Sequence, residues 1–156
     1  MTEDLIYIIN TLKERGQTLC VAESLTGGGL GQALTSVPGS SDVFLGGLIA
    51  YSQMVKEELL KVPQELIREH GVVSEEVAAA MAEGAQSIFS ATWAIATTGV
   101  AGPGPHDGVA AGTVWLAFSG PAPASTELAI DGDRTVVRNA TISSAISTFS
   151  RILRAS

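Results

Sequence analysis

A serine and a lysine, each placed where a predicted strand gives way to a helix, are the residues of this chain best suited to hydrolytic chemistry. Ser24 follows the apolar run Thr18–Ala22 and precedes Thr26, Gly27 and Gly28. Backbone N–H groups at such a helix start can hold a phosphate or a developing oxyanion, which makes Ser24 a candidate nucleophile. The alternative is that Ser24 or Thr26 simply caps the helix.

A serine nucleophile needs a base, and the chain has only two histidines. His70 precedes a helix-ending glycine, and His106 lies in a loop with no acidic partner implied by spacing, so neither predicts a triad. Lysine made neutral by burial is the other solution, and Lys56, in the helix after the second predicted strand, is the best candidate. Tyr51 could relay a proton or orient this base. The alternatives are a solvated helix lysine and a strand-end aromatic whose hydroxyl reaches water.

Two further polar features could bind a ligand. Thr98 and Gly99 open a loop rich in glycine and proline, where the backbone can approach a ligand closely. Arg134 and Arg138 lie four apart on one predicted helix face and could bind a phosphate. The alternatives are a surface connection and a solvated face. Since no cluster of His, Cys or carboxylates has metal-ligand spacing, we predict neither a metal nor a cofactor.

Composition limits the class of protein. With 156 residues, 46% of them hydrophobic, the chain fits a single domain over residues 1–156, and no apolar run is long enough to cross a bilayer. The acidic start Met1–Asp4 is unlike a secretory signal, so we expect a cytoplasmic protein with no membrane partner. The net charge of −7 argues against nucleic acid as a partner. Glycine-rich, apolar strand edges are compatible with a homo-oligomer.

Periodicity and turn residues predict an α/β fold, with a three-layer α/β/α sandwich and a mixed, mostly parallel sheet of about five strands. The turn before the last strand is too short for a crossover helix, so the last two strands should pair antiparallel. Ligands bind such sheets beyond the carboxyl ends of the parallel strands, where Ser24, Tyr51 and the Thr97–Gly99 segment should meet. The predicted strands are Thr18–Ala22, Phe44–Tyr51, Thr92–Thr98, Gly112–Phe118 and Thr126–Ile130. The predicted helices are Glu3–Arg15, Gly28–Ser36, Gln53–Leu60, Val62-Pro63 to His70-Gly71, Ser74–Phe89 and Arg134–Leu153.

Five ordered motifs carry a family resemblance over nearly the whole chain. They are Glu23–Gly28, Tyr51-Ser52 with Lys56, Thr98–Pro103, Gly112–Trp115 and Gly132–Arg134. In this order and spacing they resemble the CinA C-terminal domain family. The pattern departs at Leu25, where many relatives have cysteine, and in the loop from Gly104 to Ala111, which lacks the family's longer acidic stretch.

The resemblance implies nicotinamide-nucleotide amidohydrolase activity, in which nicotinamide mononucleotide and water give nicotinic acid mononucleotide and ammonia for pyridine-nucleotide salvage. It implies Ser24 as nucleophile, Lys56 as its base and Tyr51 as an assistant. The turn of Thr26, Gly27 and Gly28 and the loop of Thr98 and Gly99 would line the site of a small-molecule nucleotide. Two alternatives stay open: a nucleotide-binding or competence- and DNA-damage-related regulatory module without turnover, and a hydrolase of another small amide. A buried lysine with a lowered pKa would favour catalysis, and a solvated lysine would favour binding alone.

Overall fold

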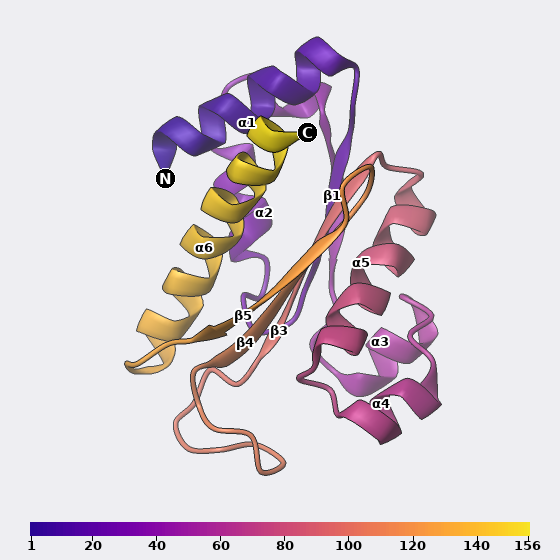
Figure 1. The fold of residues 1–156 in the computed structure, drawn as a ribbon, viewed down its shortest axis with the longest axis vertical. Coiled ribbons are helices and arrows are strands. Elements are labelled where there is room, and N and C mark those ends of the chain that lie inside the picture. The colour runs from indigo at the N-terminus through magenta and orange to yellow at the C-terminus, as the bar shows by residue number, and fades with distance from the viewer.

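A five-stranded sheet separates two layers of helices in the computed structural model, which describes residues 1–156 (Figure 1). Helices α1, α2 and α6 cover one face, and α3, α4 and α5 cover the other. The strands are β1 (Leu19–Glu23), β2 (Phe44–Ile49), β3 (Trp93–Gly99), β4 (Thr113–Ser119) and β5 (Ala124–Ala129). The helices are α1 (Thr2–Arg15), α2 (Gly29–Thr35), α3 (Gln53–Glu58), α4 (Gln64–His70), α5 (Glu75–Phe89) and α6 (Arg134–Ala155), with a short 3-10 helix over Ser40–Asp42.

The sheet has the order β2-β1-β3-β4-β5 and is mixed. Strand β1 pairs in parallel with β2 and β3, whereas β4 is antiparallel to both β3 and β5. Four of the five strands therefore point the same way, and only β4 runs against them. The α/β class, the mostly parallel mixed sheet and the antiparallel last pair are confirmed.

Three of the six α-helices begin with a capping side chain. The side chains of Ser52, Ser74 and Asp133 accept the N–H of the third residue beyond them and so begin α3, α5 and α6. Helix α1 ends at Gly16, whose φ of 63° is the left-handed conformation that glycine adopts without strain. Helices α1, α2 and α4 begin without a side-chain cap at the residue before them, and neither Ser24 nor Thr26 caps α2.

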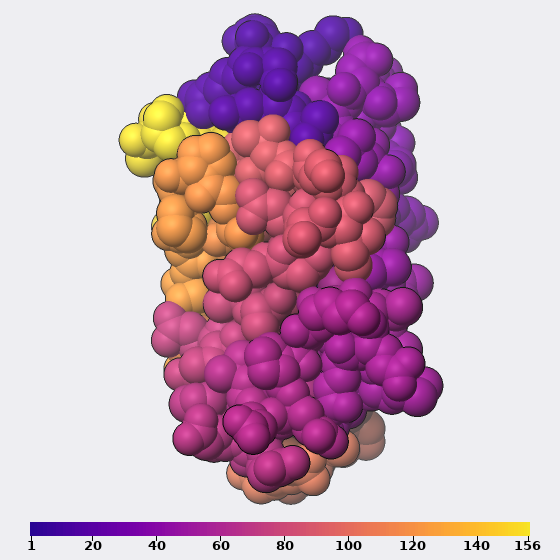
Figure 2. Space-filling view, turned by 90° about the vertical axis from the view of Figure 1, so that its right-hand side faces the viewer, coloured from indigo at the N-terminus to yellow at the C-terminus, as the bar shows by residue number.

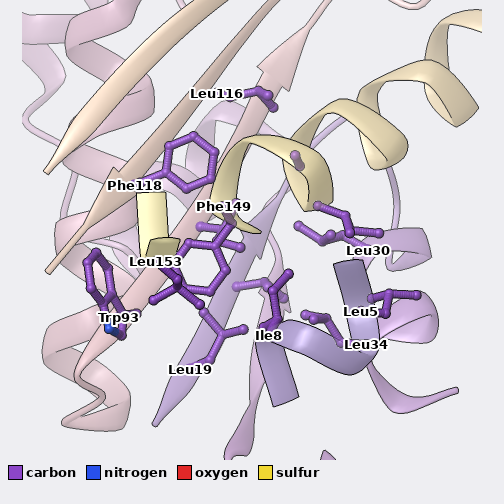
Figure 3. Close-up of a cluster of buried hydrophobic side chains, with 14 of the residues drawn as sticks. Leu5, Ile8, Leu19, Leu30, Leu34, Trp93, Leu116, Phe118, Phe149 and Leu153 are labelled. Atoms are coloured by element: carbon purple, nitrogen blue, oxygen red, sulfur yellow. The ribbon is translucent and has the colours of Figure 1, made fainter. Parts of the chain in front are cut away.

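The two faces of the sheet are packed with different side chains. On the α1 and α6 face, large residues interlock (Figure 3), and the ring centroid of Phe149 lies 5.4 Å from that of Trp93 and 6.1 Å from that of Phe118. On the other face, alanines of α5 lie against alanines of the strands. A side chain on Gly84 of α5 would collide with the carbonyl oxygen of Leu60. At Gly84, helix α5 therefore approaches the Leu60 carbonyl so closely that no side chain fits.

The carboxyl ends of β1, β2 and β3 share one end of the sheet, because these strands are parallel. Strand β2 ends at Ile49, two residues earlier than predicted, and the carbonyl groups of Ala50 and Tyr51 accept hydrogen bonds from Lys56 instead of extending a strand. The loop from β3 to β4 projects from this end of the sheet (Figure 1) and lies beneath α3 and α4 in the turned view (Figure 2). None of the helices combines the length and apolar character needed to span a membrane.

Candidate active site

Ser24 and Lys56 are in contact at the carboxyl end of the sheet. Ser24 directly follows β1, and Lys56 lies one turn into α3, the helix that leaves β2. The Lys56 Nζ atom is 3.0 Å from the Ser24 Oγ atom, and Lys56 and Ser24 are only 1% and 7% exposed, respectively. Neighbouring parallel strands place their following segments side by side, which explains how residues 32 positions apart meet.

The Lys56 amine is buried among neutral oxygens. It donates to the carbonyl oxygens of Ala50 at 2.7 Å and Tyr51 at 3.2 Å, and no carboxylate lies within ion-pairing distance. Burial lowers the pKa of Lys56 from 10.5 to about 8. A neutral amine has two N–H donors and one lone pair. With both donors directed at these carbonyls, the lone pair is left for the hydroxyl of Ser24, as a general base requires.

Local hydrogen bonds fix the turn that carries Ser24. Its N–H donates to the carbonyl oxygen of Thr97 at 3.0 Å, and its own carbonyl accepts the N–H of Gly27 at 3.1 Å. Gly27 has a φ of 58°, which closes the turn tightly. The hydroxyls of Thr26 and Thr97 lie 2.9 Å apart and tie the turn to β3. Ser24 is therefore held by the sheet itself.

The carboxylate of Glu23 lies at the N-terminus of α2, where the sequence predicted room for a bound anion. This buried carboxylate accepts the N–H groups of Leu30 at 2.8 Å and Gly31 at 3.0 Å. The N–H of Gly29 donates to the carbonyl of Thr26. The prediction that the N-terminus of α2 is open to an anion is therefore wrong. The carboxylate of Glu23 already supplies the negative charge that the positive end of the helix dipole favours. The position of an acid at a strand end, just before a glycine-rich helix start, is the signal that could have revealed this role.

A cleft of about 310 Å³ opens over Ser24 and Lys56. Four other predicted site residues line it, namely Tyr51, Thr98, Gly99 and Arg134, together with Leu25, which follows Ser24. Thr26, Gly27 and Gly28 do not line it; they lie in the turn beyond Ser24. Val72 and Val73 were not predicted as site residues, but both line one wall, and the Val72 carbonyl accepts the hydroxyl of Thr98 at 2.9 Å. The loop from Val100 to His106 completes the rim.

Tyr51 and Arg134 meet at the edge of the cleft. The Arg134 guanidinium donates to the Tyr51 hydroxyl at 3.1 Å and to the carbonyl oxygen of Gly102 at 2.6 Å. The Tyr51 side chain is exposed, and its hydroxyl contacts neither Ser24 nor Lys56. Tyr51 therefore holds the Lys56 amine through its backbone carbonyl, whereas its ring forms part of the rim.

Arg138 does not share the position of Arg134. It is half-buried behind the Ser24 turn, where its guanidinium donates to the carbonyl oxygens of Leu25 at 2.9 Å and Thr26 at 3.3 Å. It does not line the cleft. The expectation that both arginines meet one phosphate is therefore not met by the geometry, which leaves Arg134 alone at the cleft.

The cleft has a local charge opposite to that of the whole chain. Its lining includes the side chains of Lys56, Arg134 and His106 and no carboxylate, although the chain carries a net charge of −7. The Asp107 carboxylate lies 3.5 Å from His106 but points outside the lining. Such a cleft favours an anionic ligand. No group of three or more His, Cys, Asp or Glu side chains is placed to hold a metal ion.

A buried lysine against a serine, at the carboxyl edge of an α/β sheet, is the arrangement of a Ser–Lys site. The family model of the CinA C-terminal domain matches residues 5–153. The chain therefore belongs to the CinA C-terminal domain family.

Relatives and solved structures agree with this membership. A CinA-like protein of Parasynechococcus marenigrum is 58% identical over 115 residues, which cover 73% of this chain and 27% of that protein. A CinA-like protein of Myxococcus xanthus is 46% identical over 136 residues, which cover 84% of this chain and 32% of that protein. The chain thus spans about a third or less of the curated relatives' length.

Two crystal structures cover nearly the whole chain. The competence damage-inducible protein A of Klebsiella pneumoniae superposes with a TM-score of 0.93 at 32% identity, covering 97% of this chain and 96% of that one. The competence/damage inducible protein CihA of Agrobacterium tumefaciens superposes with a TM-score of 0.91 at 34% identity, covering 97% and 94%.

Proposed function

We propose that this protein is an amidohydrolase that converts nicotinamide mononucleotide and water to nicotinic acid mononucleotide and ammonia. The observation that carries the proposal is the contact between the buried Lys56 amine and the Ser24 hydroxyl, with the pKa of Lys56 lowered to about 8. A module that only binds nucleotides has no need of a lysine whose pKa is lowered beside a serine. Its buried amine therefore favours turnover over binding alone.

The reaction runs through an acyl-enzyme. Neutral Lys56 takes the proton of Ser24 as the oxygen attacks the carboxamide carbon, and the carbonyl oxygen of the substrate becomes an oxyanion. Collapse of this intermediate breaks the carbon–nitrogen bond, and the lysinium gives its proton to the departing ammonia. Water then attacks the ester, again with Lys56 as base, and releases the carboxylic acid product and the Ser24 hydroxyl.

The oxyanion needs donors beside Ser24, and the glycine N–H groups are mostly engaged elsewhere. Gly27 donates to Ser24 and Gly29 to Thr26, as described above. The N–H of Leu25, the residue that directly follows the nucleophile, donates to no protein acceptor, and Leu25 lines the cleft. We assign the oxyanion to this N–H, in the manner of serine hydrolases that use the N–H of the residue after the nucleophile.

The substrate class follows from the size and charge of the cleft. A volume of about 310 Å³ is at the small end of the range for ligand sites. The absence of carboxylates from its lining and the guanidinium of Arg134 at its rim suit a substrate with a phosphate. A phosphate held at Arg134 would place the carboxamide through the fixed length of the nucleotide.

The test compares ammonia release and binding in the protein and its Ser24→Ala variant. The unaltered protein should release ammonia from nicotinamide mononucleotide faster than from nicotinamide riboside or nicotinamide, which lack the phosphate. Ser24→Ala should lower kcat by at least about a thousandfold, because the nucleophile is lost, while calorimetry should show the nucleotide still bound. Full activity in Ser24→Ala, or no ammonia from any of the three carboxamides with the unaltered protein, would refute the proposal.

A further inference from the structure

The turn that begins at Ser24 is held by one residue that is very distant in the sequence. Glu23, at the end of β1, and Thr97, in β3, support the turn from two interior strands of the sheet. Arg138 reaches it from α6 and bonds to carbonyls 113 and 112 positions earlier in the chain. It forms no salt bridge, so the carbonyl oxygens of Leu25 and Thr26 are its acceptors.

These two bonds fix the orientation of two peptide planes. In a trans peptide the carbonyl of one residue and the N–H of the next point in opposite directions, and the bonds after Leu25 and Thr26 are trans. A guanidinium that holds the Leu25 carbonyl therefore directs the N–H of Thr26 away from α6. The same guanidinium, by holding the Thr26 carbonyl, directs the N–H of Gly27 toward the Ser24 carbonyl that accepts it.

Unpaired N–H groups make this orientation consequential. Leu25 is 4% exposed and Thr26 is fully buried, and the N–H of each donates to no protein acceptor. Buried backbone donors without acceptors are uncommon and call for a functional explanation. A rotated peptide between Ser24 and Leu25 would turn the Ser24 carbonyl oxygen to the side where the N–H of Leu25 now lies, and this oxygen would repel an oxyanion instead of binding it.

We infer that Arg138 is a positioning residue: by clamping the Thr26 carbonyl it directs the Gly27 N–H to the Ser24 carbonyl, and this bond fixes the Ser24–Leu25 peptide with the Leu25 N–H directed at the oxyanion. The inference rests on the proposed function, since it needs Ser24 to act as a nucleophile. Arg138 then acts on the transition state through the backbone, and Arg134, one turn earlier on α6, acts on the substrate directly.

The experiment measures steady-state ammonia release from nicotinamide mononucleotide with Arg138→Met and Arg138→Lys. A matched control is Arg151→Met, because Arg151 is exposed on the same helix and donates only to Thr148. We expect Arg138→Met to lower kcat by about 10- to 1,000-fold while KM stays within about threefold, because an oxyanion donor is worth up to about a thousandfold in kcat. Arg138→Lys should be intermediate, since an ammonium cannot bond both carbonyls in the planar fork of arginine.

Chemical rescue separates positioning from a purely structural role. Guanidinium or ethylguanidinium, added to Arg138→Ala at concentrations well below those that unfold it, should restore part of kcat, and the same addition should not help Ser24→Ala. A second measurement is the rate at which a fluorophosphonate labels Ser24, which should fall in the Arg138 variants in step with kcat. Thermal unfolding monitored on each variant shows whether the lost activity is only lost fold.

The outcomes are distinct. If the unaltered protein neither releases ammonia nor labels at Ser24, the proposed function fails. If it does both, and the Arg138 variants raise KM with kcat unchanged, Arg138 binds substrate and the inference fails. A kcat that falls only by the unfolded fraction, with no rescue by guanidinium, also overturns it.

Discussion

Replacing Lys56 by methionine should change the pH dependence of stability in a defined way. Each tenfold change in an equilibrium is worth about 1.4 kcal/mol, so a pKa lowered from 10.5 to about 8 means that the charged amine costs the folded state about 3 kcal/mol. Below pH 8 both the folded and the unfolded chain carry the proton and the cost is present in full. As pH rises from 8 to 10.5 the folded chain releases the proton first, so the unaltered protein gains stability over this window.

Lys56→Met abolishes this titration. It also lowers the free energy of unfolding by an amount that does not depend on pH, because the carbonyls of Ala50 and Tyr51 lose their donor. The free energies of unfolding of the two proteins should therefore differ by an amount that shifts by about 2 to 3 kcal/mol between pH 7 and pH 10, in favour of the unaltered protein at the higher pH. Urea unfolding followed by tryptophan fluorescence measures this, since Trp93 is fully buried. The comparison cancels every other titrating group. A difference that does not change with pH would mean that Lys56 has the pKa of a solvated lysine, and the base assignment would be refuted.

Three further predictions concern activity and stability. The kcat/KM for nicotinamide mononucleotide should rise about tenfold per pH unit below pH 8 and level off above it, because only neutral Lys56 accepts a proton; a flat profile from pH 6 to 9 would contradict this. Glu23→Gln should lower the free energy of unfolding by about 1 to 3 kcal/mol, measured in urea, because the start of α2 loses a charged acceptor; an unchanged midpoint would show that Glu23 is dispensable there. Gly84→Ala should cost about 1 to 3 kcal/mol because the added methyl meets the Leu60 carbonyl, whereas the exposed Ser87→Ala on the same helix should be nearly neutral; equal midpoints for the two would contradict the close packing of α5.

The elements of the fold could be predicted because their signals are local. Serines and an aspartate before the helices, glycine after α1 and alternation along β4 each act within a few residues. The approach of Ser24 and Lys56 could be predicted as well, since parallel neighbouring strands must end side by side. Both inferences use only chain geometry that holds in any α/β sheet.

The rest of the site depends on how distant elements pack, which short patterns do not encode. Arg134 and Arg138 are on one helical face by spacing, yet α6 passes the end of the sheet so that one reaches the cleft and the other reaches the back of the Ser24 turn. Val72 and Val73 lie in an ordinary apolar pair between two helices. Glu23 differs from these residues, because an acid at a strand end just before a glycine-rich helix start is a local signal for its role at α2.

The protonation state of Lys56 affects both how tightly the cleft binds an anion and whether the proposed base can act. Because Lys56 is both a positive charge beneath the ligand and, once deprotonated, the base, acidic solution strengthens the hold on anions while it stops turnover. The proposed product carries one more negative charge than its precursor, through the new carboxylate beside this amine. Under the proposed function, inhibition by accumulated product should accordingly grow as the solution becomes more acidic, so that turnover slows under the conditions in which the product is held most tightly.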